Sequence, residues 1–328
     1  MPLIEFTPNG IYVPKADVYI DPFKAVENAL ITHAHGDHAR KGNINYLCHS
    51  QSVPILKRRI GHYQFQSAEY GEIVNINGVK FSFHPAGHVL GSAQIRIEHK
   101  GEIWVVSGDY KTEDDGILTP FEAIKCHTFI TESTFGLPEF DWLPQEDIFS
   151  QINDWWQGNA NENNCSIMYA YSLGKAQRIL QYLNHQIGPV FVHGSIQNMN
   201  EAYREAGVLL KPTRKAGSDV DRKEFRKALI IAPPSADNSY WIKRFEPYVT
   251  GLASGWMSNG ASKAWLKSDN GFALSDHADW KGLNKAVLET GAEKVLVTHG
   301  YINEFADHLN KMGIEAEAIP TKFDSNPT

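Results

Sequence analysis

Cysteine is scarce in this sequence. The 328 residues include only Cys48, Cys126 and Cys165, which are far apart and form no CxxC pair. This pattern indicates neither a disulfide framework nor a zinc site built from thiolates. It is typical of proteins that work in a reducing compartment, so we expect a cytoplasmic location.

Long apolar runs are also missing. No segment approaches the roughly 20 apolar residues of a membrane-spanning helix. The first residues, MPLIEFTPNGIYVPKADV, lack the basic start and the apolar stretch of a signal peptide. With 42% hydrophobic residues the chain can still bury one large core or two smaller ones. We therefore expect a soluble globular protein with no membrane partner.

The chain lacks an excess of positive charge. Its 31 Lys and Arg and 38 Asp and Glu give a net charge of −7. Residues 171–270 nevertheless carry 14 basic and 8 acidic residues, whereas the rest of the chain carries 17 and 30. Because the local field matters more than the total, region 171–270 is a candidate surface for a polyanion. The alternative is an ordinary solvated helix surface.

The segment ITHAHGDHAR at 31–40 concentrates metal-type residues directly after an apolar run. His33, His35, Asp37 and His38 offer imidazole nitrogens and a carboxylate, which zinc accepts as ligands. Burying so many polar groups is costly unless a cation compensates for their desolvation. A solvated His-rich turn is the alternative, and further ligands elsewhere in the chain would argue against it.

Three later apolar runs end near such a residue. The run 80–83 leads to His88, the run 103–106 to Asp109 and the run 295–298 to His299. These runs read as buried strands, and loops at strand ends are common positions for a site. Seven donors exceed what one tetrahedral zinc uses, so the pattern predicts two metals that share a carboxylate. Such a pair can hydrolyse a phosphodiester.

The middle of the chain has a different pattern. From about residue 138 to 270 helical periodicity predominates, and a Gly/Pro/Ser-rich passage lies at 232–239. Strand patterns resume at Phe272, with a plausible return point at Gly271. We therefore expect an α/β protein whose first domain, 1–140 and 271–328, is interrupted by a second domain, 141–270.

Ordered motifs resemble those of a known family. HAHGDH at 33–38, PAGHVLGSAQ at 85–94, VSGDY at 106–110 and VTHG at 297–300 look like the metal motifs of the metallo-β-lactamase fold. TESTFG at 131–136, ALSDHADW at 273–280 and VTHG resemble motifs A, B and C of its β-CASP nuclease branch. ASGWM at 253–257 and SDHADW at 275–280 are similar to bacterial ligase-associated DNA exonucleases. The resemblance implies an αββα sandwich, with the β-CASP domain inserted at the boundaries given above.

The resemblance also assigns ligands. It implies that His33, His35 and His88 hold one zinc ion and that Asp37, His38 and His299 hold another. Asp109 would bridge the two ions, and manganese is an alternative metal. Asp21, in VYIDPF, matches the first family motif and would orient ligands by hydrogen bonding.

Glu132 and His277 match motifs A and B. An imidazolium held by a carboxylate can protonate a departing 3′ oxygen, which is otherwise a poor leaving group. We therefore assign proton donation to His277, with Glu132 as its support. The alternative is a structural, hydrogen-bonded histidine.

The segment YAYSLGKAQRIL at 169–180 predicts a phosphate pocket. Ser172 is expected to cap a helix opened by Gly174 and Lys175, which would present backbone N–H groups and an ammonium to an anion. Together with Tyr171 these residues resemble the stretch that receives the 5′ end of DNA in cross-link repair nucleases. The alternative is an ordinary capped helix.

These features predict a zinc-dependent phosphodiesterase that degrades single-stranded DNA from a 5′ end during repair. The family resemblance implies a DNA ligase and a helicase as candidate partners. His299 instead favours an RNA nuclease, because the cross-link repair enzymes generally have valine there. An inactive scaffold and a thioester or lactam hydrolase are further alternatives, disfavoured by the intact ligands and by motifs A to C. His193 is a candidate cleft residue, and base stacking is weighed against core packing for four tryptophans: Trp155, Trp156, Trp256 and Trp265.

Overall fold

The computed structural model describes residues 2–259 and 268–320, so Trp265 lies outside the described residues. The chain forms two compact units, one made of Met1–Phe140 and His277–Thr328 and the other of Asp141–Asp276. The predicted return at Gly271 is too early. Strand β17 (Asn270–Phe272) pairs with β16 (Tyr248–Ala253), which keeps residues 270–272 in the sheet of the second unit.

The first unit begins with a six-stranded sheet in the order β1-β2-β3-β4-β5-β6. Its strands are β1 Glu5–Thr7, β2 Gly10–Val13, β3 Val18–Ile20, β4 Asn28–Ile31, β5 Asn45–His49 and β6 Gln64–Ala68. The pairs from β3 to β6 are parallel. The loops that follow these strands therefore leave from the same edge.

A second sheet of this unit has the order β19-β18-β11-β10-β9-β8-β7. Its strands are β7 Val74–Ile76, β8 Val79–Pro85, β9 Ala93–His99, β10 Glu102–Val106, β11 Thr128–Ser133, β18 Lys294–Gly300 and β19 Glu315–Ala318. The pairs among β7 to β10 are antiparallel, whereas β10, β11, β18 and β19 run parallel. The sheet is therefore mixed.

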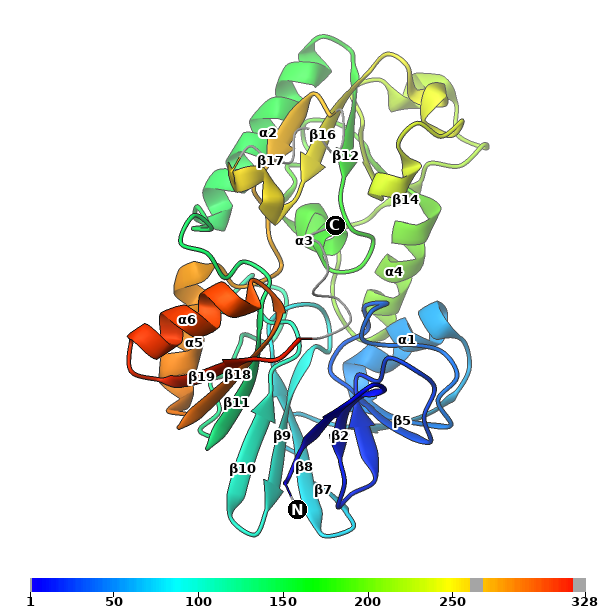
Figure 1. Ribbon diagram of the computed structural model, residues 1–328. Helices are drawn as coiled ribbons and strands as arrows, with labels where there is room; N and C mark the ends of the chain where they lie inside the picture. Colours follow the sequence, from blue (N-terminus) through cyan, green and yellow to red (C-terminus); the bar gives the residue numbers. More distant parts are fainter. Residues whose placement is uncertain (1, 260–267, 321–328) are drawn as a thin grey trace. The chain divides into compact units, whose positions relative to one another are not determined.

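Two apolar layers hold the first unit together. Side chains from both sheets, including Leu30, Phe81 and Ile95, form one buried cluster between the sheets. Helices α5 (Trp280–Thr290) and α6 (Ile302–Lys311) cover the other face of the second sheet, where Leu283 and Phe305 join a separate cluster (Figure 1). Helix α1 (Val53–Ile60) follows the 3₁₀ turn η1 (Ser50–Ser52).

The second unit is built on one parallel sheet with the order β14-β13-β15-β12-β16-β17. Its remaining elements are α2 Gln145–Asn161, β12 Cys165–Tyr169, α3 Lys175–Tyr182, β13 Val190–Val192, α4 Gly194–Glu205, β14 Arg214–Lys215, η2 Arg222–Phe225, β15 Leu229–Ala232, η3 Pro234–Ala236, η4 Ile242–Phe245 and η5 Gly255–Asn259. Continuous apolar strands such as β15 are typical of a sheet buried on both faces. One face of this sheet packs in a cluster that contains Phe191 and Phe225.

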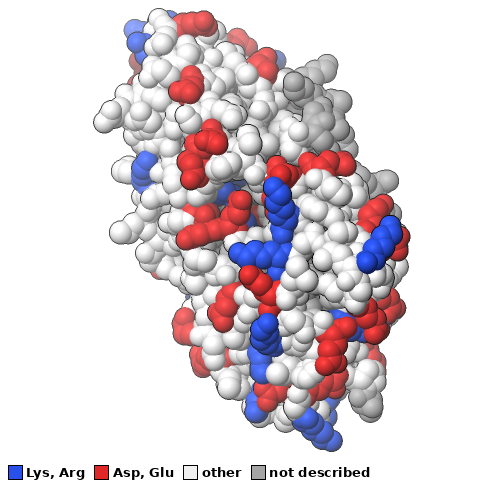
Figure 2. All heavy atoms as spheres, turned by 90° about the vertical axis from the view of Figure 1, so that its left-hand side faces the viewer, with Lys and Arg blue, Asp and Glu red and all other residues white. Residues whose placement is uncertain are grey.

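None of the helices in the described ranges combines the length and the apolar character that a bilayer crossing requires. On the face drawn in Figure 2, acidic and basic side chains are interspersed. The described part of that face therefore presents no extended surface of one charge sign.

Candidate metal centre

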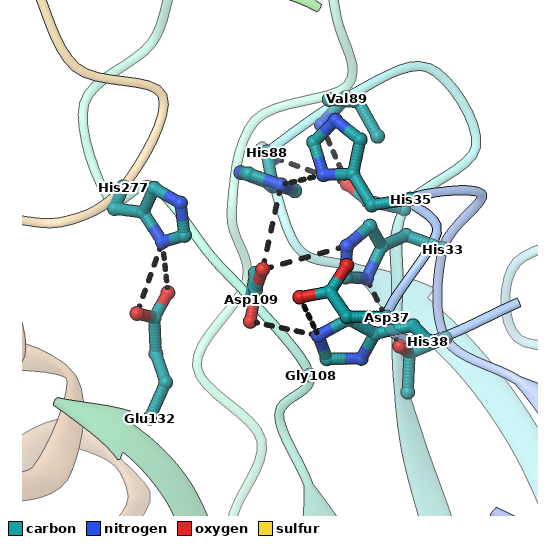
Figure 3. A network of polar contacts seen from close by, with 12 residues as sticks. His33, His35, Asp37, His38, His88, Val89, Gly108, Asp109, Glu132 and His277 are labelled. Atoms are coloured by element: carbon teal, nitrogen blue, oxygen red, sulfur yellow. Dashed lines mark hydrogen bonds and ion pairs between the residues drawn. The ribbon is translucent and has the colours of Figure 1, made fainter. Parts of the chain in front are cut away.

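The seven predicted metal ligands come from four strand ends of the first unit. His33, His35, Asp37 and His38 lie in the loop after β4, and His88 follows β8. Asp109 follows β10, and His299 is the next-to-last residue of β18. The structure brings these side chains together, with the Asp109 carboxylate among the imidazoles of His33, His38 and His88 (Figure 3).

Asp109 connects two groups of donors. Its Oδ2 lies 3.4 Å from His33 Nε2 and 3.7 Å from His88 Nε2. Its other oxygen, Oδ1, lies 3.4 Å from His38 Nε2. The Nε2 of His88 is also 3.0 Å from His35 Nδ1. The carboxylate is therefore in position to bridge two cations.

The second group is more exposed to solvent. Asp37 Oδ2 lies 3.7 Å from His38 Nε2 and 3.9 Å from His299 Nε2. The Asp37 and His299 side chains are 40% and 24% exposed, whereas His33 is fully buried. His299 has a φ of 62°, in the left-handed region, which costs about 1 kcal/mol or more and is common at functional sites.

These donors fit divalent metals. With bonds of about 2.0 to 2.2 Å, two ligands of a tetrahedral zinc ion lie roughly 3.3 to 3.6 Å apart. Most of the distances above fall near that range. The buried Nε2 atoms of His33 and His38 have no hydrogen-bond partner within the described residues. A cation would compensate for their desolvation.

Asp21 lies behind the donors, after β3. Its Oδ2 is 2.7 Å from His38 Nδ1 and accepts the Thr32 hydroxyl at 2.5 Å, while Oδ1 accepts the Thr32 N–H at 2.8 Å. The Thr32 hydroxyl is also 3.1 Å from His33 Nδ1. Asp21 therefore orients His38 directly and His33 through Thr32, as expected of a residue that supports metal ligands.

Burial and charge set the ionisation of the cluster. Burial would raise the pKa of the Asp109 carboxyl, but His38 and His33 hold that pKa well below its usual value. Burial lowers the pKa of His33 well below the ordinary histidine value. For His38 the effect of burial is outweighed by Asp109 and Asp21, which raise its pKa. These effects favour the ionised form of Asp109, which is the form that binds a cation.

The loop that carries His88 is held by its own hydrogen bonds. The Ser92 hydroxyl accepts the backbone N–H groups of His88 and Val89 at 3.0 and 3.2 Å. The Tyr70 hydroxyl donates to the Ser92 carbonyl at 3.0 Å. Gly87 has a φ of +70°, and a Cβ there would lie 2.5 Å from the Lys111 carbonyl oxygen, so this turn needs glycine.

Glu132 and His277 form a pair beside the metal ligands. His277 Nδ1 lies 2.9 and 3.0 Å from the two Glu132 oxygens (Figure 3). Glu132 is buried and also accepts the Tyr110 N–H at 2.8 Å. The His277 ring lies 4.6 Å from the His88 ring, measured between centroids. An imidazole held in this way can carry a proton on Nδ1 and present Nε2 to a substrate.

The predicted phosphate pocket lies in the second unit and differs from expectation. Ser172 does not cap α3, because Gly174 is the N-cap and its N–H is accepted by Gln177 Oε1 at 2.8 Å. The Ser172 hydroxyl instead lies 2.9 Å from the Ser195 hydroxyl. Tyr171 is exposed, at 60%.

The position of the Lys175 side chain also differs from the prediction, in which its ammonium was presented to an anion. Its side chain is buried and its Nζ lies 3.4 Å from Asp276 Oδ2. A second cation, Arg178, lies 3.6 Å from the other Asp276 oxygen. The Lys175 charge is thus partly neutralised within the second unit.

Sequence reasoning missed Ser195, which lies in the first turn of α4, directly after β13 of the same parallel sheet. Its hydroxyl is 2.8 Å from His193 Nδ1, which also accepts the Ser195 N–H at 3.1 Å. Ser172, Ser195 and His193 thus form a continuous polar chain. The Gly-Ser pair after the apolar run 190–192 is the signal that points to it, because it repeats the strand-end pattern of the metal ligands.

The tryptophans of the second unit are mainly structural. Trp156 is fully buried and donates to the Lys227 carbonyl at 3.0 Å. Trp155 packs edge to face on Phe272 with ring centroids 5.5 Å apart. Trp256 is half-buried in η5. Core packing therefore accounts for Trp155 and Trp156.

Comparisons with known proteins give distant relatives. No protein-family model matches the sequence. The chain is 27% identical, over 95% of its length, to a protein named probable DNA ligase from Opitutus terrae, of which it spans 30%. Over 58% of its length it is 28% identical to the endoribonuclease ysh1 of Aspergillus fumigatus, of which it spans 21%. The chain thus covers less than a third of either relative.

The fold is shared with a solved structure. A crystal structure of a protein of unknown function from Enterococcus faecalis V583 matches with a TM-score of 0.63 at 11% identity, over 90% of this chain and 80% of that one. The mixed α/β architecture of this chain therefore also occurs in that crystal structure. The named relatives, together with the ordered motifs and the donor cluster, confirm that the chain is related to the β-CASP nucleases of the metallo-β-lactamase fold.

Proposed function

We propose that this protein is a metal-dependent nuclease that hydrolyses phosphodiester bonds, with single-stranded DNA degraded from a 5′ end as its substrate. The observation that carries the proposal is the convergence of seven donors in two neighbouring groups, one containing Asp109 and the other containing Asp37. Two zinc or manganese ions, when bound, lower the pKa of water and neutralise charge at a phosphodiester. His33, His35 and His88 would hold one ion, Asp37, His38 and His299 the other, and Asp109 both.

The chain's own groups perform the remaining steps. Asp21 and Ser92 fix the orientation of the ligands before substrate arrives, which limits reorganisation during the reaction. Asp37 is the most exposed carboxylate of the donor set and orients the attacking water. His277 donates a proton from Nε2 to the departing 3′ oxygen, while Glu132 holds its Nδ1.

The two units would have different roles in binding a nucleic acid strand. We assign the first unit to the αββα catalytic domain and the second to the inserted β-CASP domain, with boundaries at Asp141 and Asp276. A 5′ phosphate would bind at the carboxyl end of β12, at the predicted pocket residues Tyr171, Ser172, Gly174 and Lys175. Ser195 and His193 extend this candidate pocket.

RNA is the second candidate substrate. It is favoured by the endoribonuclease names of several relatives and by the presence of histidine at position 299. DNA is favoured by the alignment along nearly the whole chain with a protein named as a probable DNA ligase. That alignment also supports a DNA ligase as a partner, and the family resemblance adds a helicase.

The decisive experiment is digestion of end-labelled strands. Matched DNA and RNA oligonucleotides with a 5′ phosphate or a 5′ hydroxyl are incubated with the zinc-loaded or manganese-loaded chain. We expect stepwise shortening of phosphorylated DNA from the 5′ end, and no cleavage by Asp37→Ala. Degradation of RNA alone would replace DNA as the substrate. Intact strands of every kind, with zinc absent from the purified protein, would contradict the nuclease assignment and favour a scaffold.

A further inference from the structure

A basic pocket lies beside the metal-binding loop, within the first unit. It is lined by the cationic side chains of Lys24, Arg40, Lys41 and Arg59, together with Phe23 and Gly36. No carboxylate belongs to this lining in the described part of the chain. The concentration of positive charge is unusual for this unit, because its residues 1–140 and 277–328 include 24 acidic and only 17 basic residues.

Three separate segments build the basic pocket. Lys24 follows β3, Arg40 and Lys41 follow the metal-binding loop, and Arg59 lies in the last turn of α1. Cations in a last helical turn are favoured by the helix dipole, which accounts for Arg59 alone. The dipole gives no reason for Lys24 and Lys41 to gather at the same place. A shared anionic ligand would account for their position.

Hydrogen bonds order the backbone next to the two exposed lysines, Lys24 and Lys41. The Asn43 side chain accepts the Val26 N–H at 3.0 Å, which ties the segment after Lys24 to the segment after Lys41. The Tyr46 hydroxyl donates to the Arg40 carbonyl at 2.7 Å and accepts the Asn43 N–H at 3.1 Å. The backbone of the basic pocket is thus organised before a ligand arrives, which reduces the entropy lost on binding.

Arg59 connects the basic pocket to the metal centre. Its guanidinium donates to the Ala34 carbonyl, between the ligands His33 and His35. A Cβ at Gly36 would lie 2.9 Å from Arg59 Nη2, so the guanidinium packs directly on the turn between His35 and Asp37. A ligand in the basic pocket therefore lies next to the metal-binding loop.

We propose that the basic pocket binds a backbone phosphate of the nucleic acid strand, close to the phosphodiester held at the metal centre. The inference rests on the proposed nuclease function and adds to it a contact on the first unit. Phosphates recur along a strand, so a nucleic acid can occupy both places at once, whereas a substrate with a single phosphate cannot. Lysine and arginine bind phosphate without reading the bases, and the contact is therefore independent of sequence.

The test removes the two exposed charges with Lys24→Gln combined with Lys41→Gln in the zinc-loaded full chain. We expect the KM for a single-stranded oligonucleotide to rise about tenfold relative to the KM for bis(p-nitrophenyl) phosphate, which has one phosphate. The slope of log affinity against log salt should become shallower by about 0.7, which is the contribution of one neutralised phosphate of a single strand. Zinc content, measured by elemental analysis, should match the wild type.

A matched control removes the same charge elsewhere. Lys15 and Lys100 are exposed and lie in the β2–β3 and β9–β10 turns, at the strand ends opposite the metal ligands. Lys15→Gln combined with Lys100→Gln should leave both KM values and the salt slope as in the wild type. The proposal would be overturned if the oligonucleotide KM rose equally in both double variants. It would also be overturned if this KM rose in neither variant.

Failure of the nuclease assignment would look different. The wild type would then hydrolyse neither substrate with zinc or manganese. Fluorescence anisotropy of a labelled oligonucleotide with the metal-loaded chain still decides the role of the basic pocket. Binding that weakens about tenfold only in the Lys24 and Lys41 variant supports the pocket, and binding that is equal in both double variants contradicts it.

Discussion

Glu132 is the residue whose replacement best separates proton transfer from metal binding. It contacts His277 through both carboxylate oxygens and is absent from the seven proposed ligands. Glu132→Gln keeps the size of the side chain but removes the charge that stabilises an imidazolium. We expect kcat to fall about 100-fold, because a positioned general acid contributes roughly 10² to 10⁴.

The control for this variant is Glu304→Gln, an exposed position in the first turn of α6, which should keep full activity. Zinc content should be equal in both proteins. If Glu132→Gln lost zinc in proportion to its activity, Glu132 would be a ligand rather than the support of an acid.

His49 makes stability depend on pH. It is buried at the end of β5, stacks on Tyr70 with ring centroids 3.6 Å apart, and its ring nitrogens have no hydrogen-bond partner in the described chain. Burial lowers its pKa to about 4, although Glu69 opposes the shift. The neutral ring is therefore favoured in the folded state. The contribution of the neutral His49 ring to the free energy of unfolding is complete above the unfolded-state pKa of about 6.5. This contribution is lost as pH falls toward 4.

The corresponding variant is His49→Phe, which keeps an aromatic ring against Tyr70 but cannot titrate. Between pH 7.5 and pH 5 the wild type should lose about 2 kcal/mol more free energy of unfolding than this variant, measured by urea denaturation. Replacing the exposed His62 by Phe should leave the pH dependence unchanged. A wild type and His49→Phe with parallel pH profiles would show that His49 titrates normally.

The clustering of the seven proposed metal ligands could be expected from the sequence, because each combines a suitable donor with the end of an apolar run. Their supporting residues were not predictable in the same way. Ser92 and Thr32 act through backbone groups or hydroxyls that a sequence pattern does not distinguish from those of other serines and threonines. Only the folded chain shows which of these groups meet.

The loop between β8 and β9 illustrates how such support works. Ser92 satisfies two backbone N–H groups, including that of His88, so the loop conformation and the ligand position are linked. Ser92→Ala leaves these buried donors without an acceptor. We expect zinc affinity, measured by competition with a chromogenic chelator, to fall about tenfold, as for other changes behind metal ligands.

Ser82→Ala is the matched control, because Ser82 is equally buried on β8 but its hydroxyl contacts His84. It should bind zinc as the wild type does. Equal weakening in both variants would indicate a general loss of stability rather than a role for Ser92 in positioning His88.

Helix α3 shows where local prediction fails. The spacing of the apolar residues Ile179, Leu180 and Leu183 in the sequence is that of one helical face, and all three are buried. The expected Ser172 cap is not formed, and the Lys175 ammonium that was expected to face an anion pairs with Asp276. Their partners, Ser195 and Asp276, are distant in sequence, and tertiary contacts override the local preference of a serine for a helix start.

The distribution of charge over the whole chain was only partly informative. The counts drew attention to residues 171–270, yet the basic pocket belongs to the acidic remainder of the sequence. Its cations come from three separate places within residues 24–59, and the short basic runs at 40–41 and 57–59 do not by themselves show that these side chains meet. The fold gathers them because α1 and the loops after β3 and β4 leave the same sheet region.

Metal removal should act on the two units differently, because each has its own apolar core and all seven proposed ligands lie in the first. A ligand present at 100 times its dissociation constant stabilises the state that binds it by about 2.7 kcal/mol. Chelation should therefore increase amide hydrogen exchange in the segments that carry the ligands, at 33–38, 85–92 and 107–111. The parallel strands at 165–169 and 229–232 serve as internal controls and should exchange at the same rate with and without metal. Equal acceleration in both units would mean that the cation stabilises the chain as one cooperative body, whereas no change in either would contradict the metal centre itself.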